Sequence, residues 1–276
     1  IYMNNCSTYE YINFKNGILD NIIDAVYVIL LLDSPRTDSV YRQINELKLS
    51  KHNIIQINKK YKDCHIDLCE QKPHFHLYYN LVNIFKHANI NNFNNILVLE
   101  DDFIFDPEIK DKHIINDLEN FINFNDFDMY CLGNTGFVIP TFNLKHLRLK
   151  STGLSHSLIF PKKSRDKVIN DYKNNKCIIN PENDPHHDIQ LNYILDKKYV
   201  YYKPLCYQPL EITENQLNWD NKLWLKINQT IFSLIEIDKK PKIGFIRLYL
   251  ISYTLSALVY FVIFFVFYKL ILKMKA

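Results

Sequence analysis

Glycine is scarce in this sequence: only 5 of its 276 residues are glycine. Neither a GxGxxG run nor a GxxxxGK(S/T) run occurs, so the glycine-rich loops that hold phosphate in many nucleotide-binding proteins are missing. The GxSxG turn of serine hydrolases is missing as well. These absences count against serine hydrolysis and against a metal-dependent nucleotidyltransferase or phosphatase that relies on a phosphate loop.

A concentrated basic face is also missing. The 33 Lys and Arg residues are balanced by 30 Asp and Glu residues along the chain, and the formal net charge is +3. Because nucleic-acid binding needs clustered basic side chains, no nucleic-acid partner is expected. The six cysteines form no CxxC pair, so a structural zinc site is not expected, and reduced thiols in the cytosol are favoured over disulfides.

One long hydrophobic run is present near the C-terminus. Residues 248–268 contain no charged side chain, and this length is close to the roughly 20 residues that a helix needs to cross a bilayer. A buried core helix is the other reading, but core helices of this length usually keep a polar face. We therefore expect a single-pass protein with a C-terminal anchor.

The side of the membrane depends on the start of the chain. No signal peptide opens the sequence, so the globule is expected in the cytosol, whereas a removed signal would place it in a lumen. In a lumen the sequons that begin at Asn5 and Asn228 would become possible glycosylation sites.

The rest of the chain alternates between two periodicities. Apolar runs typical of buried strands occur at 24–32, 53–57, 96–99, 128–132 and 199–202, with shorter extended stretches at 137–139 and 157–160. Helical periodicity occupies 37–49, 74–90, 112–124, 162–172 and 185–195. This alternation predicts an α/β fold with a mostly parallel sheet flanked by helices. The predicted parts are a globule at 1–215, a stalk at 216–242, the anchor at 243–272 and a short tail at 273–276.

Three acidic residues follow the strand predicted at 96–99. Glu100, Asp101 and Asp102 would repel one another at the carboxyl edge of a sheet, where α/β proteins bind their ligands. A divalent cation such as Mg²⁺ or Mn²⁺ would offset this charge, because hard cations prefer carboxylate oxygens. The other interpretation is a solvated loop in which one aspartate caps the next helix.

Several segments together resemble glycosyltransferase family 25, the lipooligosaccharide and collagen galactosyltransferase group. The resemblance covers nearly the whole globule, in the family's order. Its segments are strand 26–32 with Asp33, Pro35 and Arg36 after it, the LEDD at 99–102, the DMYCLG at 128–133, residues 152–159, and Asp188 ahead of 199–204.

This resemblance implies a GT-A-like fold, a UDP-hexose donor (galactose or glucose), a divalent ion, and a glycan, lipid or protein acceptor. Asp102 would be the main metal ligand. Glu100 would contact the nucleotide or its ion, and Asp101 would orient its neighbours.

The resemblance also implies roles for residues outside the acidic triplet. Asp33 and Arg36 would lie beside the nucleotide, with Arg36 bonding to phosphate. An inverting transfer needs a base, for which Asp188 is the candidate, and His156 would line the substrate site. The structural alternatives are an exposed turn residue for Arg36, a helix cap for Asp188 and a buried polar residue for His156.

One segment departs from the family pattern. Residues 69–74 keep a cysteine and a histidine but lack the family's glycine and serine. This departure supports the alternative of an inactive relative that acts as a membrane-bound sugar-binding or scaffold protein.

Overall fold

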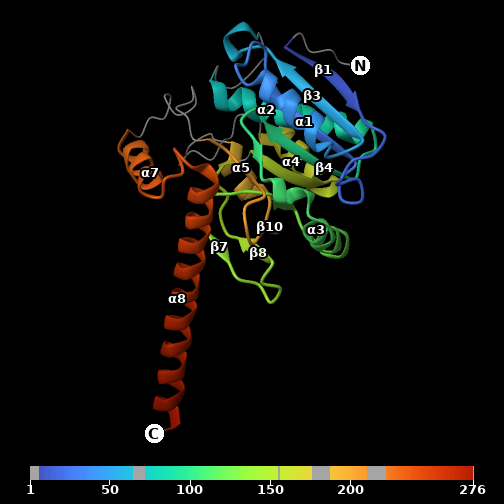
Figure 1. The fold of residues 1–276 in the computed structure, drawn as a ribbon. Helices are drawn as coiled ribbons and strands as arrows, with labels where there is room; N and C mark the ends of the chain where they lie inside the picture. The colour runs from blue at the N-terminus through green and yellow to red at the C-terminus, as the bar shows by residue number, and fades with distance from the viewer. Residues whose placement is uncertain (1–5, 65–71, 155, 176–186, 210–221, 276) are drawn as a thin grey trace.

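A nine-stranded sheet forms the centre of the protein in the computed structural model, which describes residues 6–64, 72–154, 156–175, 187–209 and 222–275 (Figure 1). The strands follow the order β1-β3-β2-β4-β9-β6-β10-β8-β7, and β11 pairs with β5 in a separate ladder. The strands are β1 (Ser7–Asn13), β2 (Ala25–Leu31), β3 (His52–Asn58), β4 (Asn95–Glu100), β5 (Ile104–Phe105), β6 (Met129–Cys131), β7 (Val138–Ile139), β8 (His146–Leu149), β9 (Ser157–Pro161), β10 (Lys198–Tyr201) and β11 (Cys206–Tyr207).

Helices lie on both faces of this sheet. The helices and short 3-10 turns are α1 (Thr37–Leu47), η1 (Tyr61–Asp63), α2 (Pro73–Ile90), η2 (Pro107–Lys110), α3 (Lys112–Phe124), α4 (Lys162–Asn175), α5 (His187–Ile194), α7 (Lys222–Leu234) and α8 (Pro241–Lys275). The α/β class predicted from the sequence is confirmed. A strand or helix is present in each segment where the sequence predicts one.

The sheet is mixed. Strands β3, β2 and β4 are parallel to one another, and β6 is parallel to β10. Strand β9 lies between β4 and β6 and is antiparallel to both, so β4 and β6 point the same way. The sequence misses β1, β8 and the β5–β11 ladder, because these strands lie at edges or are very short and carry no continuous apolar run.

Strand β2 shows why the sheet is buried on both faces. Tyr27 and its alternate neighbours pack in a core with helices α2, α4 and α5, while Val28 and its alternate neighbours pack in a second core with α1 and α3. Successive side chains of a strand point to opposite faces, so a continuous apolar run is needed to serve both cores. The directions of the strands place the carboxyl ends of β2, β3, β4 and β6 at one edge of the sheet.

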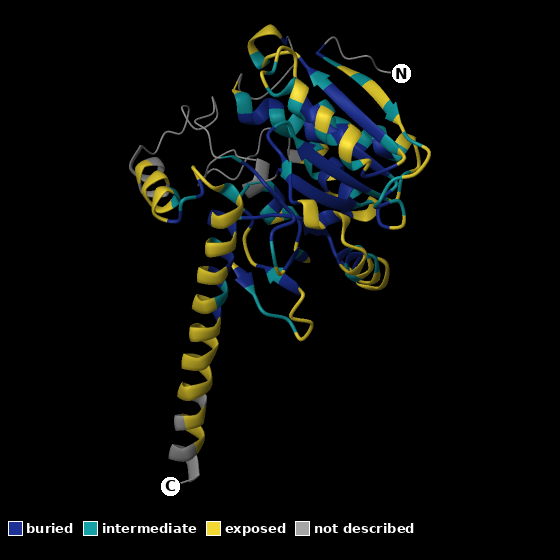
Figure 2. Ribbon diagram, in the orientation of Figure 1, coloured by how far each residue is buried: buried dark blue, intermediate teal, exposed yellow. Residues whose placement is uncertain are grey.

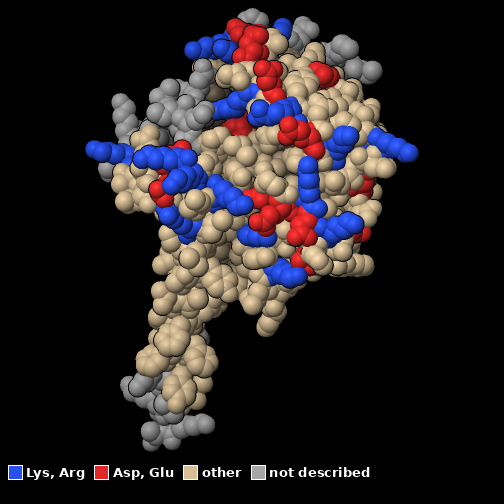
Figure 3. Space-filling view, viewed as in Figure 1, with Lys and Arg blue, Asp and Glu red and all other residues tan. Residues whose placement is uncertain are grey.

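Helix α8 begins inside the globule and then leaves it (Figures 1 and 2). Phe245 and Tyr249 belong to the core that contains α2, α4 and α5. The stretch Pro241–Val266 is long and apolar enough to cross a membrane. Figure 3 shows no charged side chain on the described shaft of α8 below the globule.

The segment predicted as a stalk contains ordered structure. Helix α7 occupies part of the 216–242 range, Ile237 is fully buried, and α8 already begins at Pro241. Arg247 Nη1 pairs with Glu236, which joins the turn after α7 to the first turns of α8.

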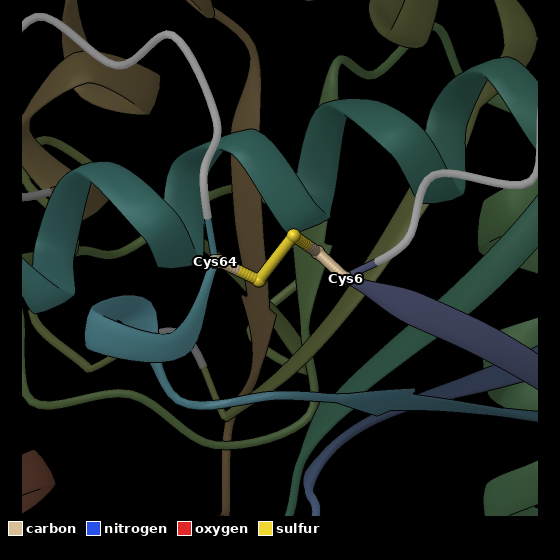
Figure 4. Close-up of a disulfide and its surroundings, with 2 residues drawn as sticks. All are labelled: Cys6 and Cys64. Carbon is tan, nitrogen blue, oxygen red and sulfur yellow. A yellow bond between two sulfur atoms is a disulfide. The ribbon is translucent and has the colours of Figure 1, made fainter.

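Cys6 and Cys64 form a disulfide between the start of β1 and the segment after η1 (Figure 4). Their Cα atoms lie 5.5 Å apart, in the normal range for a disulfide. The prediction of reduced thiols is therefore wrong for these two residues. Sequence spacing could not reveal the pair, because 58 positions separate the two cysteines and the antiparallel β1–β3 pairing brings them together. Cys131 and Cys206 are free and buried.

Candidate functional site

The acidic triplet lies where several strands converge. Glu100 ends β4, and Asp33 and Arg36 follow the neighbouring parallel strand β2. His156 directly precedes β9, which runs antiparallel to β4, so it lies at the same edge. The structure thus brings the sequence-predicted residues from three segments to one edge of the sheet.

Asp101 is held by the loop that follows β2. Ser34 Oγ donates to Asp101 Oδ2 at 2.6 Å, and Arg36 Nη1 lies 3.4 Å from Asp101 Oδ1. Burial raises the pKa of Asp101 above its usual range, and the Ser34 hydrogen bond and the Arg36 charge partly offset this rise. Arg36 is therefore engaged with an acid of the triplet rather than standing alone in an exposed turn. Asp33 in the same loop has a positive φ of 62°.

Asp102 is the most deeply buried acid of the triplet, with 5% of its surface exposed. Gln208 Nε2 donates to Asp102 Oδ2, while the buried Oδ1 has no hydrogen-bond partner among the described residues. Burial, together with the neighbouring charge of Glu100, raises the pKa of Asp102 to about 8. The negative charge of ionised Asp102 is thus only partly offset, by the Gln208 hydrogen bond and the charge of Arg36.

The contact between Gln208 and Asp102 depends on the short ladder of β5 and β11. In that ladder Tyr207 lies opposite Ile104, which places the next residue, Gln208, near the turn that carries Asp102. Gln208 has no motif around it in the sequence. Sequence reasoning misses it because a contact across 106 positions arises only from the ladder.

His156 lies beneath this edge and is fully buried. Its backbone oxygen accepts from Glu100 N at 3.2 Å, and its Nε2 lies 3.2 Å from Cys206 O. Because a carbonyl can only accept, Nε2 carries the proton, and burial lowers the pKa of the ring to about 4. The ring packs edge-on against Phe245 of α8. His156 therefore links the acidic edge to the first turns of the C-terminal helix.

A second link to α8 lies close by. Lys242 Nζ pairs with Asp106 Oδ2 at 2.7 Å, and the side chain of Asp106 is only 3% exposed. Gly133, which follows β6, packs so tightly that a Cβ there would meet Cys206 O at 1.7 Å. Sequence reasoning misses both contacts, since neither belongs to a recognisable motif.

The residues can be tested against a divalent cation. No group of three or more His, Cys, Asp or Glu side chains is arranged to hold a metal within the ranges that the structure describes. Mg²⁺, however, is commonly held by one or two carboxylates together with waters and substrate phosphates. The unpartnered oxygen and raised pKa of Asp102 fit such a site, which a substrate would complete.

The remaining predicted residue is only partly placed. Asp188 lies in the first turn of α5, which packs against α2 and α4. Its side chain lies outside the described residues.

Comparisons with known proteins give structural neighbours only. No protein-family model matches the chain, and no curated protein matches it. A solved protein from STIV covers 69% of this chain and 87% of its own, with 12% identity and a TM-score of 0.41. A glycosyltransferase involved in glycosylating the major capsid of PBCV-1 covers 65% of this chain and 84% of its own, with 10% identity and a TM-score of 0.38. The neighbours thus include a glycosyltransferase at low identity.

Proposed function

We propose that this protein is a membrane-anchored glycosyltransferase that moves a hexose from a UDP-sugar to a glycan, lipid or protein acceptor. The proposal depends on one observation: a buried carboxylate, Asp102, has an unpartnered oxygen at the carboxyl edge of parallel strands. The segments that resemble glycosyltransferase family 25 also support it, since Asp33, Arg36 and the triplet lie at this edge.

The loop after β2 is suited to the diphosphate of the donor. Arg36 keeps a quarter of its side chain exposed while it lies beside Asp101, so its guanidinium can still meet phosphate oxygens. Charge-assisted bonds of this kind are roughly twice as strong as neutral ones. Asp101 and Ser34 hold this loop in place, which reduces the entropy lost when the donor binds.

Asp102 and Glu100 would hold a Mg²⁺ or Mn²⁺ ion. When bound, such an ion supplies positive charge that stabilises the departing diphosphate. Gln208 fixes the carboxylate plane of Asp102 through Oδ2 and leaves Oδ1 available. The chain's own contribution is thus a pre-oriented oxygen in a site largely shielded from water.

Asp188 is proposed as the base of an inverting transfer. A base must accept the proton of the acceptor hydroxyl as that oxygen attacks the anomeric carbon from the face opposite the leaving diphosphate. The proton goes to the carboxylate, the new bond forms to the acceptor oxygen, and the electron pair of the broken bond leaves with UDP.

Helix α8 is proposed as the membrane anchor. The Cys6–Cys64 disulfide favours an oxidising compartment for the globule, in place of the cytosol expected from the sequence. A protease-protection assay on sealed membranes, followed by thiol alkylation without reductant, tests this side. We expect the globule to be protected from the protease and Cys6 and Cys64 to resist alkylation, because the disulfide blocks them. A globule on the cytosolic side in which both thiols are alkylated would refute the oxidising compartment.

The enzymatic proposal is tested by screening nucleotide sugars for hydrolysis by the full chain in detergent, with and without Mn²⁺. Metal-dependent release of UDP from one sugar is expected, with loss of that release in Asp102→Ala. Glu46→Gln, on the exposed side of α1, is the matched control and should keep activity. Full turnover by Asp102→Ala would refute the site.

The alternative of an inactive sugar-binding relative predicts a different pattern. In that case Mn²⁺ and UDP would raise the melting temperature, because a ligand that binds only the folded state stabilises it, yet no sugar would be released. If no nucleotide sugar is either bound or hydrolysed, both functions are rejected.

A further inference from the structure

The open edge of the sheet is covered by α8. Strand β7 is the last strand of the sheet, and its Val138 N donates to Ser252 Oγ of α8 at 2.9 Å. Ser256 Oγ in turn donates to Val138 O. Two serines one helical turn apart thus bind both backbone groups of one β7 residue, and they fix β7 beside the helix.

The position of these serines along α8 sets the height of β7. Arg247 is the last charged residue before the uncharged run, and Ser252 and Ser256 lie about 7 Å and about 13 Å beyond it at 1.5 Å rise per residue. The run that ends at Tyr268 is about 30 Å long, which matches the hydrocarbon layer. If α8 spans a bilayer, β7 therefore lies level with the part of the hydrocarbon layer that is nearest to the globule.

The turn between β7 and β8, residues 140–145, extends below the rest of the globule, in the direction in which α8 runs toward its C-terminal end (Figure 1). This β7–β8 turn exposes two large apolar side chains: Phe142 is fully exposed and Leu144 is 61% exposed. The lower end of the globule beside the shaft bears mostly uncharged side chains (Figure 3). Exposed apolar side chains gathered at a tip mark contact with a protein or a membrane.

Several polar groups of the same turn are bonded, to one another or to neighbouring parts of the chain. Thr141 Oγ1 lies 2.6 Å from the backbone oxygens of both Asn143 and His146. Asn143 Oδ1 accepts from Lys145 N at 3.1 Å, and Asn143 O accepts from His146 N at 3.0 Å. Lys145 Nζ pairs with Asp117 of α3 at 2.7 Å. A turn that enters a poorly hydrated layer needs such internal bonding, because unpaired polar groups there are costly.

We propose that the β7–β8 turn inserts Phe142 and Leu144 into the same bilayer face that α8 enters, as a second attachment of the globule to lipid. This inference rests on the proposed anchor, since the bonds between β7 and α8 set the height of β7, from which the turn starts. The geometry favours lipid over a protein partner because β7 is bonded to the uncharged run of α8 and the turn points in the direction in which that run continues (Figure 1).

The test uses the full chain in phosphatidylcholine nanodiscs, with the photoreactive residue benzoylphenylalanine at one position at a time. The positions are Phe142 in the turn, Phe264 on the shaft of α8, and Tyr11 as the matched control. Phe264 and Tyr11 are both exposed aromatic residues, and Tyr11 lies on β1 at the opposite edge of the sheet. After illumination, intact-mass measurement detects a covalent phosphatidylcholine adduct.

Lipid adducts at positions 142 and 264, with none at position 11, are the expected result. An adduct at position 264 alone would overturn the insertion of the turn and leave the anchor intact. Absence of lipid at position 264 would overturn both the anchor and this inference. A cross-link from position 142 to a second copy of the chain would overturn the lipid contact in favour of a protein contact, and equal adducts at position 11 would show non-specific exposure to lipid.

Discussion

Asp102 is unusual among the acids that the structure describes, because one of its oxygens is bonded and the other is buried without a described partner. Its neighbours Glu100 and Asp101 add negative charge rather than remove it. A protein tolerates such an arrangement where a ligand supplies the missing charge. The residue-scale predictions therefore concern protonation and loss of charge.

Stability in the absence of ligand should depend on the protonation of Asp102. Its pKa is raised to about 8 in the folded protein, well above the ordinary value of about 3.9 for an unfolded chain. Protonated Asp102 therefore makes its full contribution to the free energy of unfolding below about pH 4, and this contribution is lost as the pH rises through about 8. We expect Asp102→Asn to remove this loss, so that the variant melts above the parent at alkaline pH.

Melting temperatures measured against pH in chelator check this prediction. Glu46→Gln, which removes one exposed carboxylate, controls for net charge and should follow the parent curve. Parallel curves for Asp102→Asn and the parent would contradict the assignment.

The proposed base can be separated from the nucleotide site by one substitution. Asp188→Asn removes the proton acceptor but keeps the size of the side chain, so transfer should fall by 10²-fold or more, the usual contribution of a general base. UDP with Mn²⁺ should still raise the melting temperature of the variant. Loss of that rise would make Asp188 a donor-binding residue.

The sequence predicted part of this site and missed the rest for physical reasons. Glu100, Asp101 and Asp102 follow a strand that is readable from its apolar run, so their place at the sheet edge could be predicted. Gln208 and Ser34 could not, because their roles arise from a two-residue ladder and from a loop conformation. Such contacts leave no periodicity in the sequence.

At the scale of elements, α8 combines two roles. The uncharged run is visible in the sequence and predicts a membrane span. The same helix also carries a docking stripe, the residues that contact the globule: Phe245, Tyr249, Ser252 and Ser256. The stripe could not be predicted because its members are apolar or small, like the rest of the run. The free surface of a membrane helix and a buried surface against protein call for similar residues.

The two serines of the stripe should contribute to stability. Ser252→Ala leaves Val138 N without its acceptor, and an unsatisfied buried donor costs about 1–3 kcal/mol. Thr254→Ala is the matched control, since Thr254 Oγ1 bonds to Leu250 O of its own helix at 2.7 Å. Thermal melting in detergent should show a clear drop for Ser252→Ala only. Equal drops for both variants would argue against the edge contact.

The site of truncation should decide whether the globule folds without the exposed part of α8. Cutting after Lys242 removes the buried Phe245 and Tyr249, and loss of a single core aromatic residue costs about 3–5 kcal/mol. Cutting after Ala257 keeps the whole stripe. We expect the longer piece to melt cooperatively and the shorter piece to be unstable or aggregated, as judged by circular dichroism and size-exclusion chromatography. A well-folded shorter piece would show that the stripe adds little.

At the scale of the whole molecule, the disulfide and α8 secure opposite edges of the sheet. The disulfide fixes the β1 edge, and the helix covers the β7 edge. The two edges are secured differently, because α8 bonds to the backbone of β7, whereas β1 pairs only with β3 and is tied at its start by the disulfide.

Reduction should therefore loosen the β1 edge first. For a loop of this length the chain-entropy model gives a stabilisation of about 4 kcal/mol, so dithiothreitol should lower the melting temperature markedly. A Cys6→Ser/Cys64→Ser double variant should melt at the reduced value with or without dithiothreitol. Sensitivity of that variant to the reductant would place the effect at another cysteine.

The docked start of α8 has one more consequence. Phe245 packs in the core and also belongs to α8, which leaves the globule. No flexible joint therefore separates the globule from the exposed part of α8 at this residue. Rotation of the whole molecule about the axis of α8 would therefore keep the acidic edge at a constant height along that axis. If α8 spans a membrane and the protein transfers sugar as proposed, the acceptor hydroxyl would have to reach that height above the bilayer. The length of the acceptor between its own attachment point and that hydroxyl would then decide whether it is a substrate.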